Sequence, residues 1–304
     1  MRIVFLGTPD FAIPSLKAIC GTHHEIVAVI TQPDKPGNRQ VMTPPPVKVE
    51  AEALGLSVYQ FASLRKEGAD TIRALAPDLM VTAAFGQIIS QEILDIPKYG
   101  TFNVHGSLLP KYRGSSPIQQ CLLNGDTVTG VTIMRTALAV DSGDIVLQKE
   151  IEITENDNAG TLFDKIAETG AAAIVEAIEL LDAGKVTYTP QDHSQATFCK
   201  MITKADGALT KDTGAVAAMR KIRAYNPWPV AYVTVNGERL RIYQAELTEK
   251  QGEVGSFFAS GDALGLNLSD GALLIERLQA EGRKAMSARE YLIGHKDIWG
   301  KTIE

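Results

Sequence analysis

Strand and helix patterns alternate along the first 180 residues, and this alternation constrains the fold more than any other feature of the chain. Short apolar runs typical of strands occupy 2–6, 24–31, 57–58, 79–84, 101–104, 130–134 and 145–153. Segments with helical patterns lie between or after them, at 12–19, 47–53, 69–75, 90–94, 118–124 and 160–183. Such alternation predicts an α/β fold with a doubly wound, mostly parallel sheet, in which 130–134 and 145–153 form a strand pair.

The pattern changes after residue 204, so a second domain is expected in a chain of 304 residues. A helix is predicted at 213–224, followed by five short strands that tight turns such as Asn236-Gly237 separate. Short strands with tight turns are typical of a small β-barrel. We therefore expect domains at 1–184 and 205–304, joined by a polar, turn-rich linker at 185–204.

A site in a parallel sheet lies beyond the carboxyl ends of its strands, where the loops that start at Gly7, Phe85 and His105 are expected to meet. The first of these loops has the place of a dinucleotide fingerprint but lacks its second and third glycines. The phosphate-binding pattern G-x-x-x-x-G-K-[ST] does not occur either. NAD and ATP are therefore not expected as ligands.

Composition narrows the class of protein. The formal net charge of −6 does not indicate a general nucleic-acid binder, although 205–304 hold equal numbers of basic and acidic residues. Apolar runs end well short of the ~18 residues that span a bilayer. The N-terminus begins almost directly with a strand pattern instead of a leader. We expect a cytoplasmic protein without a membrane partner.

Cysteine and histidine spacing gives no indication of a metal. Cys20, Cys121 and Cys199 are far apart and form no C-x-x-C pair, which argues against a disulfide framework and a zinc site. The adjacent His23 and His24 are expected to point to different faces of the element that carries them. No metal is therefore expected.

Asn103, His105 and Asp141 are the residues most suggestive of chemistry, and the sequence places them in loops that follow apolar runs. An imidazole can act as acid or base, an amide can donate to a developing oxyanion, and a carboxylate can fix the histidine's tautomer and charge. Together they suit acyl transfer without an enzyme nucleophile. A structural histidine beside a carboxylate is the plainer alternative.

These residues resemble a known family. The stretch 103–110, with Asp141 36 residues beyond His105, is similar to the formyltransferases that use 10-formyltetrahydrofolate. Further matching stretches are 7–12, 31–36, 109–119, 222–229 and 282–288. The last two narrow the resemblance to methionyl-tRNA formyltransferases. It implies a Rossmann-like formyltransferase domain, then an OB-like barrel that binds tRNA, and a monomer.

The resemblance also implies the reaction. A formyl group would pass from N10 of 10-formyltetrahydrofolate, the co-substrate, to the α-amino group of methionyl initiator tRNA. Asn103 and a protonated His105 would donate hydrogen bonds to the formyl oxygen, and Asp141 would raise the pKa of His105. The same carboxylate would be able to position a water that relays the amine proton.

The resemblance assigns the ligand-binding residues as well. Those implied for the folate are Phe85, Gly86, Ile88, Ser107, Leu108, Leu109 and Pro110. Those implied for the substrate are Gly7, Thr8, Lys35 and Arg39, the last two from the proline-rich loop 32–46. Core packing is the plain alternative for the leucines and Ile88, and solvated surface charge for Lys35. The basic candidates in the second domain are Arg220, Lys221, Arg223, Arg239, Arg241, Arg283 and Lys284.

Three other functions fit parts of the pattern. A formyltransferase for a nucleotide-linked amino sugar would share Asn103, His105 and Asp141, without needing 222–229 or the basic residues of 205–304. A formyl-folate hydrolase would need no tRNA-binding extension. A non-enzymatic RNA-binding protein would be favoured only if the three residues were disrupted.

Overall fold

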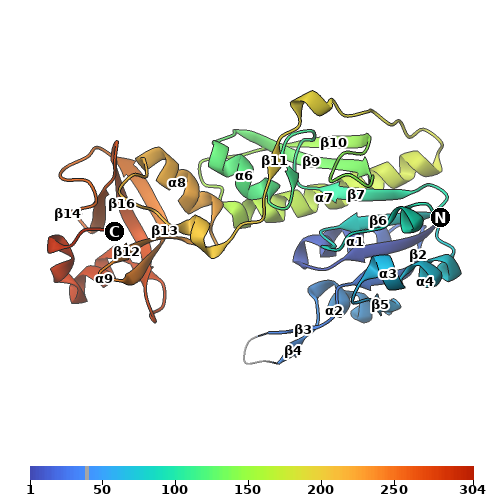
Figure 1. The fold of residues 1–304 in the computed structure, drawn as a ribbon, viewed down its shortest axis with the longest axis horizontal. Coiled ribbons are helices and arrows are strands. Elements are labelled where there is room, and N and C mark those ends of the chain that lie inside the picture. The colour runs from blue at the N-terminus through green and yellow to red at the C-terminus, as the bar shows by residue number, and fades with distance from the viewer. Residues whose placement is uncertain (38–40) are drawn as a thin grey trace. The chain divides into compact units, whose positions relative to one another are not determined.

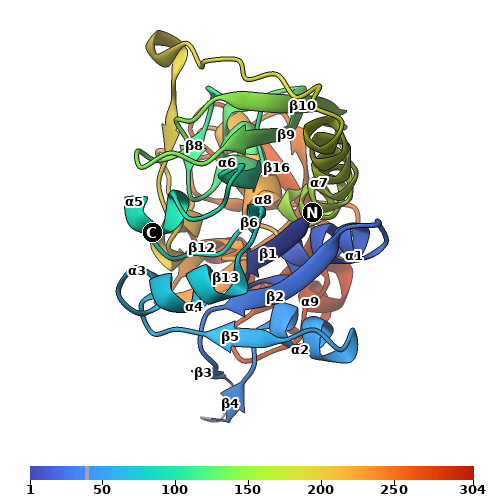
Figure 2. The same ribbon diagram turned by 90° about the vertical axis from the view of Figure 1, so that its right-hand side faces the viewer.

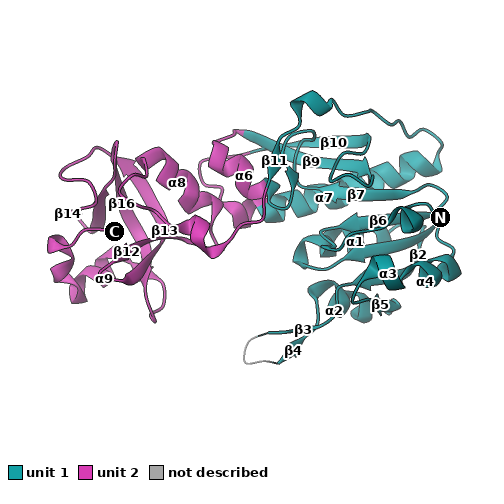
Figure 3. Cartoon of the chain, viewed as in Figure 1, with its two compact units in different colours: residues 1–117, 128–152, 163–199 teal, residues 118–127, 153–162, 200–304 magenta. Residues whose placement is uncertain are grey.

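The computed structural model describes residues 1–37 and 41–304, and the chain divides into two compact units (Figure 3). Unit 1 comprises 1–117, 128–152 and 163–199. Unit 2 comprises 118–127, 153–162 and 200–304. Within the described residues, no helix is long and apolar enough to span a membrane.

A seven-stranded sheet forms the centre of unit 1, in the order β10-β9-β7-β6-β1-β2-β5 (Figure 1). The parallel strands are β1 (Arg2–Gly7), β2 (Glu25–Thr31), β5 (Val58–Gln60), β6 (Leu79–Ala83) and β7 (Thr101–His105). The antiparallel pairs are β7 with β9 (Val128–Arg135) and β9 with β10 (Ile145–Glu152). The predicted mostly parallel sheet is confirmed, including its strand pair.

Helices cover both faces of this sheet (Figure 2). On one face, Leu64, Ile72 and Ile93 pack on strand residues such as Val4 and Met80. They belong to α3 (Leu64–Glu67), α4 (Ala69–Leu75) and α5 (Gln91–Leu94). Figure 2 shows α1 (Ile13–Cys20) and α7 (Ala159–Asp182) on the opposite side. Because both faces are covered, the central strands are apolar throughout, which is what their sequences show.

The remaining elements of the first 199 residues are short, apart from α2 (Pro46–Ala53) and α6 (Pro117–Asn124). A hairpin of two-residue strands, β3 (Lys35–Pro36) and β4 (Met42–Thr43), lies in the proline-rich loop. After α7 the chain stays in unit 1 as far as Cys199. There β11 (Phe198–Cys199) pairs in parallel with β8 (Arg113–Gly114).

Unit 2 is built on a six-stranded antiparallel sheet. The order is β12-β13-β16-β15-β14, and β17 also pairs with β16. The strands are β12 (Ala231–Val235), β13 (Glu238–Thr248), β14 (Phe257–Ser260), β15 (Ala263–Asn267), β16 (Ala272–Ala280) and β17 (Met286–Ser287). Helices α8 (Ala215–Ala224) and α9 (Ala288–Gly294) contribute Ile222 and Tyr291 to its core. Asn236 and Gly237 both have positive φ, the requirement of a tight two-residue hairpin. The predicted helix followed by short strands with tight turns is confirmed, and the antiparallel sheet is consistent with the expected small OB-like barrel.

Candidate active site

Asn103 and His105 lie in strand β7. The strand predicted at 101–104, which includes Asn103, is confirmed, and the loop placement expected for these two residues was wrong. β7 pairs with β6 on one side and with β9 on the other, and the apolar run before the histidine extends through it. Residues two apart in a strand point to the same face. The amide and the imidazole therefore share one face at the carboxyl end of β7, the edge where sites in parallel sheets occur.

A hydrogen bond from the neighbouring strand orients the amide of Asn103. The Thr82 hydroxyl donates to Asn103 Oδ1 at 2.7 Å. Because Oδ1 is the acceptor in this pair, the amide's Nδ2–H groups point away from Thr82. The part of the chain that the structure describes contains no hydrogen-bond acceptor for Nδ2. The side chain is thus set to donate to a ligand.

His105 is buried, with 6% of its surface exposed. Its Nε2 lies 3.1 Å from the carbonyl oxygen of Tyr112, so Nε2 carries a proton and donates it. Its Nδ1 lies 3.6 Å from Asp141 Oδ2, as expected for a carboxylate that faces the ring.

The pKa of His105 shifts in the direction opposite to expectation. Burial lowers it below its ordinary value, while Asp141 and the Tyr112 carbonyl raise it by less. Removing water from around an imidazolium costs more here than one carboxylate at 3.6 Å restores. A lowered pKa favours the neutral ring, with its proton on Nε2, over the protonated form expected from the sequence.

Asp141 is the one member of the three that lies in a loop. Its φ of 46° is in the left-handed region, an unusual conformation for a residue with a side chain. Its Oδ2 accepts a hydrogen bond from the backbone N–H of Gly114 at 2.8 Å. Gly143, two residues on, has no room for a side chain, since a Cβ would stand 1.7 Å from the carbonyl oxygen of Arg135.

A buried pair of side chains holds the loop around Asp141. Gln191 Nε2 donates to the carbonyl oxygens of Asp141 and Gly143, at 2.9 and 2.7 Å. Gln191 Oε1 in turn accepts from the guanidinium of Arg113 at 2.7 Å. Gln191 is 6% exposed and Arg113 4% exposed. In this way the segment after α7 helps to build the site.

The stretch 107–110, expected to contact folate, forms a firmly held loop. The Ser107 hydroxyl donates to the Lys111 carbonyl oxygen at 2.6 Å, so it fixes the loop. Thr132 of β9 donates to the carbonyl oxygen of Ser107 and accepts from the N–H of Leu109. Leu109 is buried, and Leu108 is part of the crowded surroundings of Gly130. Packing against neighbouring residues therefore accounts for the positions of the two leucine side chains. The peptide bond between Leu109 and Pro110 is cis.

The loops after β1 and β6 meet, as expected from the sheet. The Thr8 hydroxyl donates to the carbonyl oxygen of Phe85 at 2.8 Å, and Gly7 ends the adjacent strand β1. Gly86 follows with φ of 78°, close to Gln32. Phe85 itself is 4% exposed and belongs to the core.

Ile88 and Lys35 line one pocket of about 530 Å³, although they were assigned to different ligands. Ile88 is 69% exposed, so it does not belong to the core. Lys35 Nζ donates to Gln32 Oε1 at 2.6 Å. The other lining residues are Gln32, Pro33, Ala62, Ser63, Arg65 and Gln87. Arg39, the expected tRNA contact, lies outside the described residues.

Comparisons with known proteins place these features in a family. Residues 1–178 match the family described as "Formyl transferase", and residues 201–296 match "Formyl transferase, C-terminal domain". The chain belongs to the formyl transferase family.

Relatives of this formyl transferase match it over its whole length. The methionyl-tRNA formyltransferase of Geotalea daltonii is 42% identical, over 100% of this chain and 98% of the relative. That of Stenotrophomonas maltophilia is 43% identical, over 98% of this chain and 99% of the relative.

Solved structures share the fold. The N-formyltransferase from Helicobacter canadensis, in complex with folinic acid and dTDP-3-aminofucose, has a TM-score of 0.67 and 20% identity. That match covers 92% of this chain and 99% of the other. HypX from Aquifex aeolicus, in complex with tetrahydrofolic acid, has a TM-score of 0.64 and 17% identity. It covers 96% of this chain and 47% of HypX. At these identities the likeness shows the fold alone.

Proposed function

We propose that this formyl transferase moves the formyl group of 10-formyltetrahydrofolate to the α-amino group of methionyl initiator tRNA. Full-length relatives at 42–43% identity that are named methionyl-tRNA formyltransferases are the observation that carries the proposal. The match of residues 201–296 to the C-terminal domain of the formyl transferase family supports the proposal further. The tRNA and the folate are thus the proposed partners of a cytoplasmic monomer.

The chemistry needs few groups from the protein. The neutral α-amine attacks the formyl carbon, whose oxygen gains negative charge. When the intermediate collapses, the bond from the formyl carbon to N10 breaks, and N10 takes up a proton while the amine loses one. No covalent enzyme intermediate is required. Asn103 is placed to donate its free Nδ2–H to the oxygen, an interaction worth about 10²–10³ in rate in comparable sites.

A neutral His105 is suited to accept the amine proton, directly or through one water. Uptake of the proton on Nδ1 would give an imidazolium between the Asp141 carboxylate and the Tyr112 carbonyl. These two groups both raise the pKa of His105. The two partners therefore stabilise the charge that forms during the reaction. Asp141 is the group we assign to that stabilisation, together with the orientation of the ring.

We assign the catalytic domain to residues 1–184, the linker to 185–204 and the tRNA-binding domain to 205–304. Packing of Gln191 on the Asp141 loop adds a supporting role for the linker segment. In 205–304, Arg223 donates to the Asp157 and Thr154 carbonyls, and Lys221 donates to the Ala208 carbonyl. The exposed Arg239, Arg283 and Lys284 are better placed for tRNA phosphates.

The ligand assignments rest on the resemblance to the family. The folate is assigned to the 107–110 loop and to the chain from Phe85 to Ile88. The methionyl end of the tRNA is assigned to Gly7, Thr8 and Lys35, with Arg39 as a phosphate contact. Because Lys35 and Ile88 share a pocket, the two ligands would approach each other there.

The proposal is tested by offering two acceptors to the enzyme with 10-formyltetrahydrofolate. One is methionyl initiator tRNA, with uncharged tRNA as its control, and the other is a dTDP-linked amino sugar. Formylmethionine on the tRNA, and no formylated sugar, is the expected result. Formylation of the sugar alone would refute the tRNA assignment and establish the alternative acceptor.

A further inference from the structure

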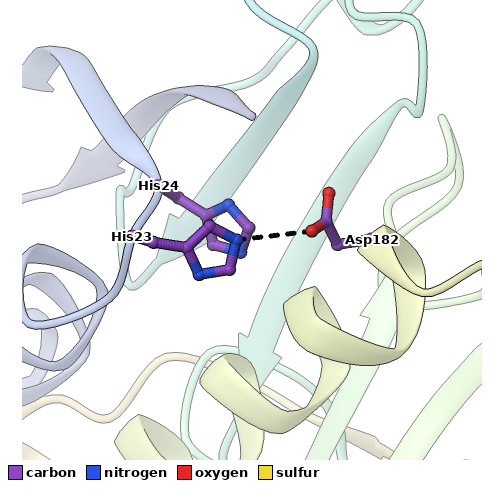
Figure 4. A group of neighbouring side chains, drawn as sticks. All are labelled: His23, His24 and Asp182. Carbon is purple, nitrogen blue, oxygen red and sulfur yellow. Dashed lines mark hydrogen bonds and ion pairs between the residues drawn. The ribbon is translucent and has the colours of Figure 1, made fainter.

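His23 and His24 lie side by side in the turn between α1 and β2, facing the end of α7 (Figure 4). Their ring centroids are 3.9 Å apart. The expectation that adjacent histidines would point to different faces was wrong, because a turn does not impose the alternation of a strand. Asp182, the last residue of α7, lies opposite them.

The donor atoms of these residues are close enough to share an ion. One ligand atom from each of His23, His24 and Asp182 can be chosen so that all lie within 4.8 Å of one another. His23 Nε2 lies 3.3 Å from Asp182 Oδ2. Glu179, one helical turn before Asp182, places Oε1 3.3 Å from His24 Nε2. Residues three apart on a helix lie on the same side, so both carboxylates face the turn.

A buried nitrogen in the cluster lacks a hydrogen-bond partner. The side chain of His24 has no exposed surface, and its Nε2 makes no hydrogen bond. The nearby Glu179 oxygen is at ion-pair distance without hydrogen-bond geometry. His24 Nδ1 lies 3.1 Å from the Met1 amine. When Nδ1 carries the ring proton and donates it to a neutral Met1 amine, the lone pair of Nε2 is available to another ligand. Buried polar groups are normally satisfied, so this atom points to a missing partner.

We propose that His23, His24 and Asp182 bind a divalent transition metal, Zn²⁺ being the best fit, with Glu179 as the fourth ligand. Zinc takes imidazole and carboxylate ligands in a tetrahedron, with bonds of about 2.0–2.2 Å. Ligand atoms in such a tetrahedron are about 3.3–3.6 Å apart. Two of the donor pairs already have a separation of 3.3 Å. Glu179 is outside the group of atoms that lie within 4.8 Å of one another, so its side chain would have to rotate toward the other three ligands.

The site is distinct from the one proposed for formyl transfer. His24 immediately precedes β2, whereas His105 is the last residue of β7. The two strands run parallel in one sheet. The cluster therefore lies at the amino ends of the parallel strands, and the proposed reaction takes place at their carboxyl ends. The metal would therefore act as a clamp between the α1–β2 turn and the end of α7.

Metal binding is measured on the full chain, freed of any purification tag and of bound metal. Co²⁺ is titrated while its visible absorption is recorded, and Zn²⁺ is then used to displace it. The test variants, His23→Ala and Asp182→Asn, change partly exposed side chains, so folding is preserved. Glu168→Gln removes an exposed carboxylate elsewhere on α7 as the matched control. Cys20→Ser controls for binding by the partly exposed thiol at the end of α1.

The proposal expects one equivalent of Co²⁺ with a tetrahedral spectrum that lacks a thiolate charge-transfer band. Each test variant should weaken binding at least tenfold, while both controls bind as the native chain does. Zn²⁺ should also raise the Tm of the native chain and of the controls, and not that of the two test variants. Absence of saturable binding overturns the proposal. Equal binding by native chain and test variants, or loss of binding with Cys20→Ser, overturns it as well.

Discussion

Gln191 holds Asp141 in place from 50 residues away, by a hydrogen bond of 2.9 Å from its side-chain amide to the aspartate's carbonyl oxygen. The same amide reaches Gly143, so the loop is held on both sides of Ser142. The geometry of the proposed reaction therefore depends on a segment that lies after α7.

Replacing Gln191 by Ala should lower kcat at least tenfold, because the Asp141 loop loses two hydrogen bonds and the Arg113 guanidinium loses one of its acceptors. A loss of about 1–3 kcal/mol in the free energy of unfolding should accompany it. Steady-state formylation and chemical denaturation measure the two effects. Gln195→Ala, which removes an exposed amide paired with Asp192, is the control and should leave both unchanged. A Gln191→Ala enzyme with native kcat would disprove this positioning role.

Thr82→Val should reduce kcat by about three- to tenfold, with KM for the folate nearly unchanged. The substitution keeps the shape and removes the hydroxyl that fixes the Asn103 amide, so the amide spends time in the wrong orientation. Single-turnover formylation measures this effect. In the Asn103→Ala background the same substitution should have no further effect, because there is no amide left to orient. Independent, multiplicative losses would contradict the account.

The pKa of His105 should lie below the ordinary histidine value of about 6.5. Burial lowers it and Asp141 opposes that shift, so Asp141→Asn should lower the pKa further. The unfolded chain then binds a proton that the folded chain excludes, and His105 makes the protein less stable as pH falls below about 6.5. NMR titration of the imidazole, assigned with His105→Asn, gives the value directly. A pKa above 6.5 would show that the carboxylate outweighs burial, and a pKa that rises in Asp141→Asn would contradict the raising effect assigned to Asp141.

Arg283→Ala and Lys284→Ala should each raise KM for methionyl-tRNA. Each should also reduce the slope of log KM against log salt concentration by about one unit. Both residues are exposed in the turn between β16 and β17, where phosphates are accessible. Arg73→Ala is the control, since that guanidinium already pairs with Asp70 and Glu92. Kinetics over a range of salt concentrations provide the slopes. A slope equal to that of the native enzyme would exclude a phosphate contact for the residue concerned.

Local patterns predicted most of the fold. The apolar runs at 2–6, 79–84 and 101–104 are buried strands, because strands covered on both faces need continuous apolar sequence. The Asn236-Gly237 turn was also predictable, since few residues adopt positive φ. By contrast, β8 and β11 are strands of only two residues, and their pairing joins segments that are 85 residues apart. No local signal marks such a contact.

The identity of the site residues was predictable from the sequence, but the direction of the pKa shift at His105 was not. Asn103, His105 and Asp141 stood out by residue type, yet the pKa direction of His105 depends on burial that no spacing reveals. Thr82 could have been found, because it lies on the strand next to β7. Gln191 could not, since its partners lie 48 and 50 residues earlier and its segment is polar throughout.

The central claim is that this site transfers a formyl group to methionyl initiator tRNA with Asn103 and His105 acting on the reacting atoms. Single-turnover formylation by native enzyme, Asn103→Ala and His105→Ala, with folate binding measured in parallel, tests it most directly. The account predicts native folate affinity, a chemical step slowed about 10²–10³-fold in Asn103→Ala, and no detectable transfer in His105→Ala. Transfer at the native rate by either variant would contradict it.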